Sequence, residues 1–303
     1  MKKSLLEAIK DRPLLGDGAM GTQLMFAGLE QGNCGEAWNL THPENVLGIQ
    51  RRYVEAGSDC LLTNTFGGCR IMLNRHGNAD KVAEVNRAAV EIARRAFGGR
   101  ERYVIGDIGP FGGLLEPYGD FTEDQVREAF NEQASALVSA GADGIIIETQ
   151  TALEELLLGI QASKQAGAAC VIGSLAYDVT LDGSTFRTMM GIDPERAAEF
   201  MQENGVDIVA LNCGTRMDMV RALEAVKRYR SVTDLPVMVQ PNAGQPKLVN
   251  MKVVYDESPE EMAKGVVPLL EAGANIVGAC CGSTPEHIRA FRAAMDQYLS
   301  VKA

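Results

Sequence analysis

Three of the seven cysteines follow apolar segments in a way that would let their thiols meet. Cys213 ends the segment DIVALNCG (207–214), and Cys280 and Cys281 end the segment NIVGACCG (275–282). Soft divalent metals such as zinc favour thiolate ligands, with four donors in structural sites and three plus an open position in catalytic sites. No Cys-x-x-Cys pair and no histidine at finger spacing accompany these cysteines. The pattern therefore predicts a zinc site with three cysteine ligands and a free fourth position.

Two other interpretations of these cysteines stay open: buried apolar thiols, which are the usual state of a free cysteine, and a vicinal disulfide between Cys280 and Cys281. Adjacent strand residues point to opposite faces, so this pair can reach one metal only where the chain leaves regular strand geometry. Gly278 and Gly282 flank the pair and permit that departure. We expect the apolar role for the four cysteines that have no partner in the pattern, Cys34, Cys60, Cys69 and Cys170.

The composition limits the class of protein. The 303 residues carry a formal charge of −11, which argues against nucleic acid or an anionic membrane as the main partner, because both select basic surfaces. Seven cysteines are too few, and odd in number, for a disulfide framework. The apolar runs are far shorter than the roughly 20 residues that span a bilayer, and charged residues interrupt any signal-peptide core. We expect a cytoplasmic protein.

The elements that must position the cysteines are short apolar runs bounded by Gly, Asp or Asn. Helical apolar spacing occupies the stretches between the runs, as with Val82, Val85, Ala89 and Ile92. Strands that alternate with helices pair in parallel, and eight of each in this length predict one closed (β/α)8 barrel domain over residues 1–303. The eight predicted strands lie in segments 14–19, 59–66, 103–109, 144–149, 171–177, 207–214, 237–243 and 275–282.

A glycine that ends a helix precedes every second predicted strand, at Gly57, Gly141, Gly205 and Gly273. Polar or sulfur-containing residues follow seven and eight positions later, at the carboxyl end of each of these strands: Asn64 and Thr65, Glu148 and Thr149, Asn212 and Cys213, Cys280 and Cys281. In a barrel these ends surround one mouth, where active sites of this fold lie. Asn64 and Thr65 are therefore candidate substrate contacts, although strand ends are often polar simply because they meet solvent.

Ser or Thr three residues before Glu or Gln can satisfy the first amides of a helix. Such pairs begin at Thr41, Thr122, Ser258 and Ser283, and each precedes a helical pattern. We expect helix starts at these four positions.

Six segments carry a resemblance to the homocysteine S-methyltransferase family, especially to the homocysteine-binding module of cobalamin-dependent methionine synthase. They are GDGAMGTQL (16–24), NLTHPENV (39–46), EAGSDCLLTNTFGG (55–68), LNCG (211–214), QPNAGQP (240–246) and VGACCGSTPEHI (277–288). The resemblance extends from about residue 12 to 300, and the last segment is its most specific part. Ala279 and Ser283 depart from the common GGCCGT pattern without changing a ligand.

The resemblance implies a zinc-containing (β/α)8 barrel in which Cys213, Cys280 and Cys281 hold the metal. It also implies that Asp17 and Glu148 bind the ammonium group of homocysteine. A carboxylate directly after GIII would be costly if buried without a partner, which supports a binding role for Glu148. The backbone amides of the loop at Gly18 could take the substrate carboxylate.

The implied reaction is transfer of a methyl group to the zinc-bound thiolate of L-homocysteine, which forms methionine. The favoured donor is a methylated corrinoid on a separate protein, because the barrel leaves no length within these residues for a cobalamin-binding domain. S-Methylmethionine or another onium donor is the alternative enzyme hypothesis, and a non-catalytic zinc- or thiol-binding protein is the second. No protein base is required, and His42, His76 and His287 are expected to be surface or capping residues.

Overall fold

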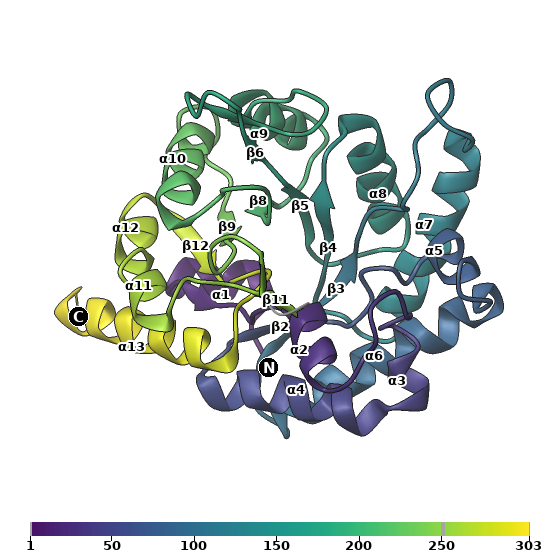
Figure 1. Ribbon diagram of the computed structural model, residues 1–303, viewed down its shortest axis with the longest axis horizontal. Helices are drawn as coiled ribbons and strands as arrows, with labels where there is room; N and C mark the ends of the chain where they lie inside the picture. Colours follow the sequence, from purple (N-terminus) through teal and green to yellow (C-terminus); the bar gives the residue numbers. More distant parts are fainter. Residues whose placement is uncertain (1, 250–251, 303) are drawn as a thin grey trace.

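The computed structural model describes residues 2–249 and 252–302, and its strands form the predicted (β/α)8 barrel. The main sheet has the order β1-β12-β9-β8-β5-β4-β3-β2, and all its paired strands are parallel. Figure 1 shows the strands around the centre of the molecule and the helices outside them. Its strands are β1 (Leu14–Leu15), β2 (Cys60–Leu62), β3 (Tyr103–Ile108), β4 (Gly144–Gln150), β5 (Val171–Leu175), β8 (Ile208–Asn212), β9 (Val237–Gln240) and β12 (Ala274–Val277).

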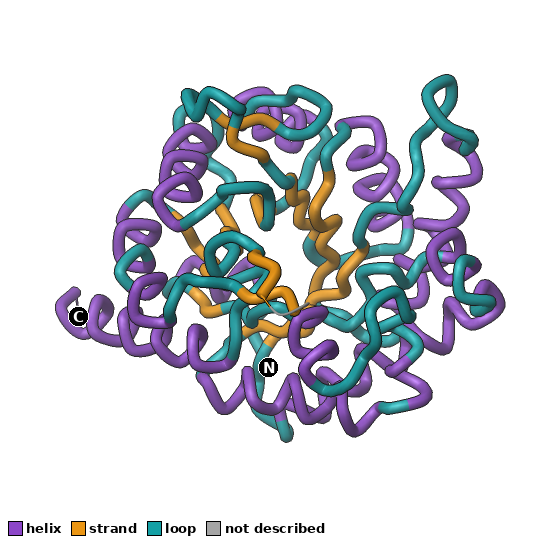
Figure 2. The backbone as a smooth tube through the Cα atoms, in the orientation of Figure 1, coloured by secondary structure: helices purple, strands orange, loops and turns teal. Residues whose placement is uncertain are grey.

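Each of the eight predicted segments overlaps one of these strands, so the barrel is confirmed. The extent of the domain over residues 1–303 stays a prediction, because residues 1, 250–251 and 303 lie outside the described residues. Two antiparallel hairpins were not predicted, and Figure 2 shows their short strands. They are β6 (Asp178–Val179) with β7 (Phe186–Arg187), and β10 (Lys247–Val249) with β11 (Lys252–Val254).

Most of the helices cover the outside of the barrel, and the longer ones each bury an apolar face against it. They are α1 (Leu5–Asp11), α2 (Met20–Phe26), α3 (Trp38–Thr41), α4 (Pro43–Ala56), α5 (Arg70–Asn74), the 3₁₀ turn η1 (Ala79–Lys81), α6 (Val82–Phe97), α7 (Glu123–Ser139), α8 (Leu153–Gln165), α9 (Pro194–Glu203), α10 (Met219–Arg230), α11 (Pro259–Ala263), α12 (Val266–Glu271) and α13 (Pro285–Lys302). Over the described residues, no helix combines the length and the apolar character needed to cross a membrane.

The apolar core has two parts. One lies between strands and outer helices, and the other fills the barrel, where inward side chains such as Ile105, Ile146 and Ile208 are fully buried. Leu5 and Ile9 of α1 pack against this inner part, so α1 closes the amino-terminal end of the barrel. The opposite end, at the carboxyl ends of the strands, is therefore the open one.

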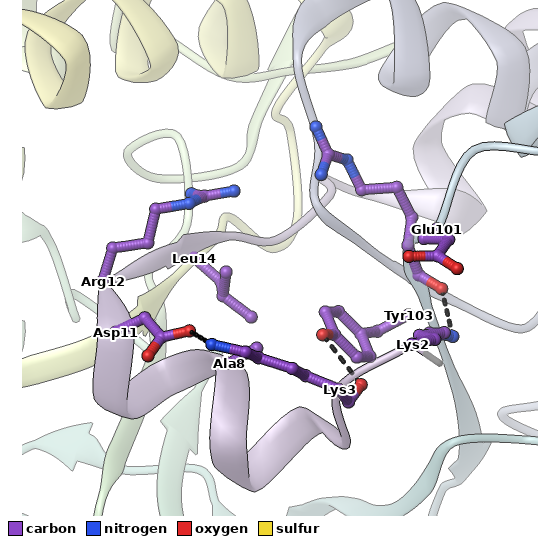
Figure 3. Close-up of a pocket in the computed structure, with 9 residues that line it drawn as sticks. Lys2, Lys3, Ala8, Asp11, Arg12, Leu14, Glu101 and Tyr103 are labelled. Carbon is purple, nitrogen blue, oxygen red and sulfur yellow. Dashed lines mark hydrogen bonds and ion pairs between the residues drawn. The ribbon is translucent and has the colours of Figure 1, made fainter.

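Charged groups beside α1 are paired with one another (Figure 3). The Lys3 ammonium lies 2.6 Å from an Asp11 carboxylate oxygen, and Lys2 lies 2.8 Å from Asp143. The hydroxyl of Tyr103 donates to the Lys3 carbonyl at 3.1 Å. Both lysine ammonium groups therefore form ion pairs inside the protein. The hollow that these two lysines and Tyr103 line lies at the closed end of the barrel.

The four glycines of the repeat adopt the left-handed conformation, with φ between 68° and 111°, and the residue two positions later has a structural role. Each of these residues accepts a hydrogen bond from the backbone amide of the preceding odd strand of the barrel. Asp59 accepts from Leu15, Asp143 from Val104, Asp207 from Val171 and Asn275 from Val237, at 2.7–3.1 Å. The repeat therefore ends a helix and also sets the register of the next strand.

The junction between β1 and β2 depends on carboxylates because each of these strands pairs with its other neighbour only. Asp59 donates its amide to the Leu15 carbonyl at 2.7 Å and accepts the Leu15 amide through its side chain. Further along, the Leu62 amide donates to Oδ2 of Asp17 at 2.9 Å. Two buried carboxylates thus close the barrel where a regular ladder is missing.

Asp59 is 1% exposed and has three guanidinium groups around it. Arg12, Arg292 and Arg102 place nitrogen atoms 2.9, 3.1 and 3.4 Å from its oxygens. Burial opposes the charge of Asp59, but the hydrogen bonds from Arg12 and the Leu15 amide outweigh burial, so its pKa lies below the ordinary value.

The helix starts were predicted only in part. Thr122 forms a capping box with Gln125, and Ser258 caps α11. At Thr41 and Ser283 a helix does follow, but neither residue is its cap, because α4 begins at Pro43 after His42 and α13 begins at Pro285. The Ser283 hydroxyl instead donates to the nearby Cys280 carbonyl at 2.8 Å and accepts the Ala19 amide at 2.9 Å, a contact that only the closed barrel provides.

Asp59→Asn should lower the free energy of unfolding by about 3 kcal/mol at neutral pH, because it removes a buried carboxylate that is the shared counter-charge of three partly buried guanidinium groups. A carboxylate with a lowered pKa stabilises the folded state above the pKa of the unfolded chain, near 4, and this contribution disappears as the pH falls below it. The deficit should therefore shrink in acid, as measured by urea unfolding at several pH values.

Asp207→Asn is the matched control. Asn275 already makes the equivalent bond with an amide oxygen, so this change should cost less than about 1 kcal/mol. Equal losses in the two variants would contradict the role assigned to the arginine cluster.

Candidate metal centre

The open end of the barrel contains a pocket of about 410 Å³. It is lined by the ends of β2, β3 and β4, by the turns after β8 and β12, and by the loop after β1. We call it the mouth pocket. Its walls include the three predicted metal ligands and Glu148. The structure thus brings together residues that lie far apart in the sequence.

The sulfur atoms of Cys213, Cys280 and Cys281, here called the thiol cluster, all lie within 4.8 Å of one another. Two of the separations are 3.8 Å (Cys213 to Cys281) and 3.9 Å (Cys280 to Cys281). A zinc ion bound tetrahedrally at about 2.3 Å from each sulfur separates the sulfurs by about 3.8 Å. The cluster therefore fits a thiophilic divalent metal, and Cys280 and Cys281 are free thiols in this structure, since a disulfide would place their sulfurs about 2.05 Å apart.

Irregular backbone beyond the strands lets all three thiols converge. β12 ends at Val277, so Cys280 and Cys281 lie in a turn, as predicted from the flanking glycines. Gly282 has φ of 81°, and a Cβ there would lie 2.1 Å from the Tyr255 ring, so only glycine fits. Cys213 itself is left-handed, with φ of 56°.

Contacts within the thiol cluster shift the pKa values of its thiols in opposite directions. Hydrogen bonds with Cys280 and Cys281 lower the pKa of Cys213 to about 3. The same contacts, together with burial, raise the pKa of Cys280. Binding a metal would release the remaining protons, because metal ligation requires thiolates.

Asn212 links the thiol cluster to the end of β4. It is 1% exposed, and it forms a reciprocal pair with Thr149, in which the Thr149 amide donates to Oδ1 at 3.0 Å and Nδ2 donates to the Thr149 hydroxyl at 2.7 Å. Nδ2 also lies 3.8 Å from the sulfur of Cys280. Thr149 has φ of 57°, an uncommon conformation for a β-branched residue, and the pair with Asn212 holds it there.

Glu148 lies in the wall of the mouth pocket and is 7% exposed. Its hydrogen bond with Gln240 is long, at 3.5 Å. Burial, followed by the negative charges of Cys213 and Asp17, raises the pKa of Glu148 to about 8. Burial also raises the pKa of Asp17 to about 7, and Oδ2 of Asp17 is already bonded to Leu62. Both groups would be stabilised by a bound cation.

Asn64 and Thr65 also line the mouth pocket, but their donors are used within the protein. Nδ2 of Asn64 donates to the Gly35 carbonyl at 2.8 Å and to Asn39, which holds the loop after α2 against the pocket. The Thr65 hydroxyl donates to the Asp107 carbonyl at 2.7 Å. Direct contact of either residue with a substrate stays a prediction.

Gly18 lies where two side chains approach the backbone closely. A Cβ at this position would be 2.6 Å from the Ser283 hydroxyl and 3.0 Å from the Tyr53 ring, so glycine is needed for packing. Just beyond it, Met20 and Gly21 begin α2 at the pocket, and this helix has no side-chain cap among the described residues. Its first amides are free to donate hydrogen bonds to an anionic group, and binding of a substrate carboxylate there stays a prediction.

Sequence reasoning missed Asp107 at the end of β3. This residue is 5% exposed, lines the mouth pocket and has a buried Oδ1 without a hydrogen-bond partner in the described part of the chain. The signal was a charged residue inside the apolar run YVIGDIG. β3 is the third strand of the barrel, and the glycine repeat that predicted polar strand ends precedes only the second, fourth, sixth and eighth strands.

One minor prediction needs correction. Cys34 is not a buried apolar thiol, since it is partly exposed at the mouth pocket and its sulfur lies 3.4 Å from Glu36. His287 is a capping residue, as expected, and it lies buried between Thr284 and the Glu257 carbonyl. His76 is exposed at the rim of the same pocket.

A model of homocysteine S-methyltransferases matches residues 14–295, which include the whole barrel and the thiol cluster. The chain belongs to the homocysteine S-methyltransferase family. Methionine synthases of Mycobacterium leprae (strain TN) and Mycobacterium tuberculosis (strain ATCC 25618 / H37Rv) are both 35% identical to it, over 310 and 308 residues. These alignments cover 96% of this chain, which spans 25% of the length of either relative.

Solved structures agree on the fold. The homocysteine methyltransferase MmuM from Escherichia coli, in its metallated form, superposes with a TM-score of 0.77 at 21% identity, over 95% of this chain and 99% of that one. A 3-dehydroquinate dehydratase from Geobacillus kaustophilus superposes at 0.57 with 13% identity, over 96% and 93%. At these identities the likeness concerns the barrel architecture alone.

Asn212→Ala should lower the Zn²⁺ affinity of the protein by about 10- to 100-fold, because residues that orient metal ligands typically contribute this much. The affinity can be measured by competition with a chromophoric chelator. Ser174→Ala removes only the 2.6 Å bond from Ser174 to Oδ1 of Asn212, so its effect should be much smaller. Wild-type affinity in the Asn212 variant would contradict this role.

Proposed function

We propose that this chain is a zinc-dependent methyltransferase that transfers a methyl group from a methylated corrinoid to L-homocysteine and forms methionine. The observation that carries the proposal is the thiol cluster in the wall of the mouth pocket, with the spacing of three zinc ligands and with space beside it. Among the described residues, the metal-binding group contains three donors, as an open catalytic site requires. A closed four-ligand group would have favoured a non-catalytic zinc protein.

Zinc bound by the thiol cluster would take the homocysteine sulfur as a fourth thiolate, which is the nucleophilic form of a thiol whose free pKa is near 8.5. The protein needs no general base for this step, and the three histidines have structural or exposed positions. Three cysteinate ligands leave little positive charge on such a site, so the bound sulfur keeps its reactivity. The protein's own residues then orient the rest of the amino acid.

Glu148 is the proposed partner of the substrate ammonium group, because its buried carboxylate has only a weak partner in Gln240. Asp17 stays a predicted second partner through the oxygen that is not bonded to Leu62. The first amides of α2 are the proposed partners of the substrate carboxylate. The substrate sulfur would be held by zinc, and its ammonium and carboxylate groups by the wall of the mouth pocket. These three fixed points would together select amino acids of one side-chain length.

A methylated corrinoid is the proposed donor, carried by another protein or domain that docks at the open end. The supporting observations are the 35% identity to methionine synthases and the lining of the mouth pocket, which among the described residues includes one aromatic ring of the Phe, Tyr or Trp type, that of Phe66. Onium donors are commonly held by several aromatic rings. Trp38 stacks on His42 instead. A cytoplasmic location, which would keep the thiols reduced, stays a prediction.

The test is a donor comparison on protein whose zinc content has been measured. L-Homocysteine is supplied with methylcobalamin, a methylated corrinoid protein, S-methylmethionine or betaine, and methionine is quantified. Methionine with the corrinoid donors supports the proposal, and turnover with S-methylmethionine alone would replace the donor. No methionine with any donor would overturn the assignment to homocysteine methylation.

Cys281→Ala should lose both bound zinc and activity, because two thiolates and water hold zinc far more weakly than three thiolates. Zinc is measured by atomic emission on gel-filtered protein. Cys170→Ala removes a thiol that lies away from the cluster and should retain zinc at the wild-type level. Retention of one zinc per chain in Cys281→Ala would refute the ligand role.

Glu148→Gln should keep the metal but raise the KM for homocysteine by about 10- to 100-fold, since a charge-assisted hydrogen bond to the ammonium group is lost. Steady-state kinetics measure the effect. Glu154→Gln, which changes an exposed glutamate on α8, is the control and should leave KM unchanged. Loss of zinc in Glu148→Gln would show that its role is to support the metal site.

A further inference from the structure

Asp107 is a buried carboxylate, and its Oδ1 atom has no hydrogen-bond partner among the described residues. It lies near the end of β3, in register with Ile146 on the neighbouring strand β4. Paired residues of a parallel sheet face the same side, and Glu148 follows Ile146 by two positions. Asp107 and Glu148 are therefore on the inner face of adjacent strands, and both line the mouth pocket.

The backbone of Asp107 is held firmly by the neighbouring chain. Its amide donates to the Thr63 hydroxyl at 3.0 Å, and its carbonyl accepts the Thr65 hydroxyl at 2.7 Å and Nε2 of Gln133 at 3.2 Å. None of these bonds reaches the carboxylate. The structure thus fixes the position of the side chain while its Oδ1 atom stays buried and without a partner among the described residues.

A buried carboxylate without a partner is costly, and here its neighbours add to the cost. Burial first, and then the negative charges of Glu148, Asp17 and Glu36, hold the pKa of Asp107 well above its usual range. Carboxyl groups with strongly shifted pKa values cluster at binding and catalytic sites. A cation bound between these carboxylates would stabilise their ionised forms, which burial disfavours.

The form of that cation follows from the spacing of the donors. In the described part of the chain, the thiol cluster is the one group of three potential ligands close enough to hold a metal ion, and it does not include Asp107. An ammonium group has three hydrogens that point in different directions and can bridge carboxylates on separate strands. An organic ammonium thus fits better than a second metal.

We propose that Asp107 binds the ammonium group of the substrate together with Glu148, and that this pair makes the site selective for thiols that carry a protonated amine. The inference rests on the proposed function, since it takes the substrate thiol to be bound at the thiol cluster. It differs from the expected pairing of Asp17 with Glu148. Asp17 is bonded to Leu62 across the β1–β2 junction and does not line the mouth pocket, whereas Asp107 does.

The test compares two thiols that differ only in the amino group, L-homocysteine and γ-mercaptobutyrate. The full chain is loaded with Co²⁺, because sulfur-to-cobalt absorption grows when an additional thiolate binds, so binding is measured without turnover. The wild-type protein should bind homocysteine much more tightly than its analogue. In Asp107→Asn, and also in Asp107→Ala, this preference should fall by about 10- to 100-fold, while affinity for γ-mercaptobutyrate stays the same or improves.

Two controls keep the result specific. The cobalt spectrum before thiol addition shows whether each variant is folded around an intact thiol cluster. Asp124→Asn removes a carboxylate that is 90% exposed and should leave the preference at the wild-type value. Having two Asp107 variants, one of similar shape and one smaller, guards against a single variant that does not fold.

The outcomes separate this inference from the proposed function. Equal preference for homocysteine in the wild-type protein and in both Asp107 variants would overturn the role of Asp107, with the methyltransferase proposal unaffected. Equal binding of the two thiols by the wild-type protein would overturn ammonium recognition as a whole. If neither thiol changes the cobalt spectrum of the wild-type protein, both the proposed function and the inference fail.

Discussion

The junction between β1 and β2 is closed by side-chain carboxylates, and the mouth pocket depends on this closure. Asp59 binds Leu15 and three arginines, and Asp17 binds the Leu62 amide further along the same junction. A barrel converges its strand ends on one point only when it is closed. Cys213 and Cys281, 68 positions apart in the chain, lie 3.8 Å from each other because β8 and β12 both pair with β9, and closure brings the end of β2 to the same mouth.

Negative charge dominates the pocket that closure creates. The thiol cluster gains more charge when a metal replaces its protons, and Asp17, Glu148 and Asp107 are buried around the same space. Repulsion among these groups is a cost of folding that a bound dication and a substrate ammonium would offset. Asn212 connects the two halves of the site, because it contacts both Cys280 and the strained turn at Thr149 next to Glu148.

The three cysteines could be predicted because thiols after apolar runs have few common uses, and the flanking glycines allowed the turn that they need. The (β/α)8 barrel could be predicted because each strand carries its own apolar run and each helix its own periodicity. The failed helix caps show where local patterns stop being informative. Ser283 had the local pattern of a cap, but its hydroxyl accepts the amide of Ala19, which is 264 positions away in the chain and lies outside any sequence window.

The sequence by itself therefore determined the barrel, the three cysteines that converge and the repeat of Gly-x-Asp or Gly-x-Asn before every second strand, because these features depend on residue type and local spacing. Only the tertiary structure decided which carboxylates are free to bind a substrate. Asp17, Asp107 and Glu148 have the same functional group, and their difference lies in the partners that the fold supplies. Leu62 occupies an oxygen of Asp17, while Oδ1 of Asp107 has no partner among the described residues. Such partners come from strands distant in the chain, so residue type alone does not specify them.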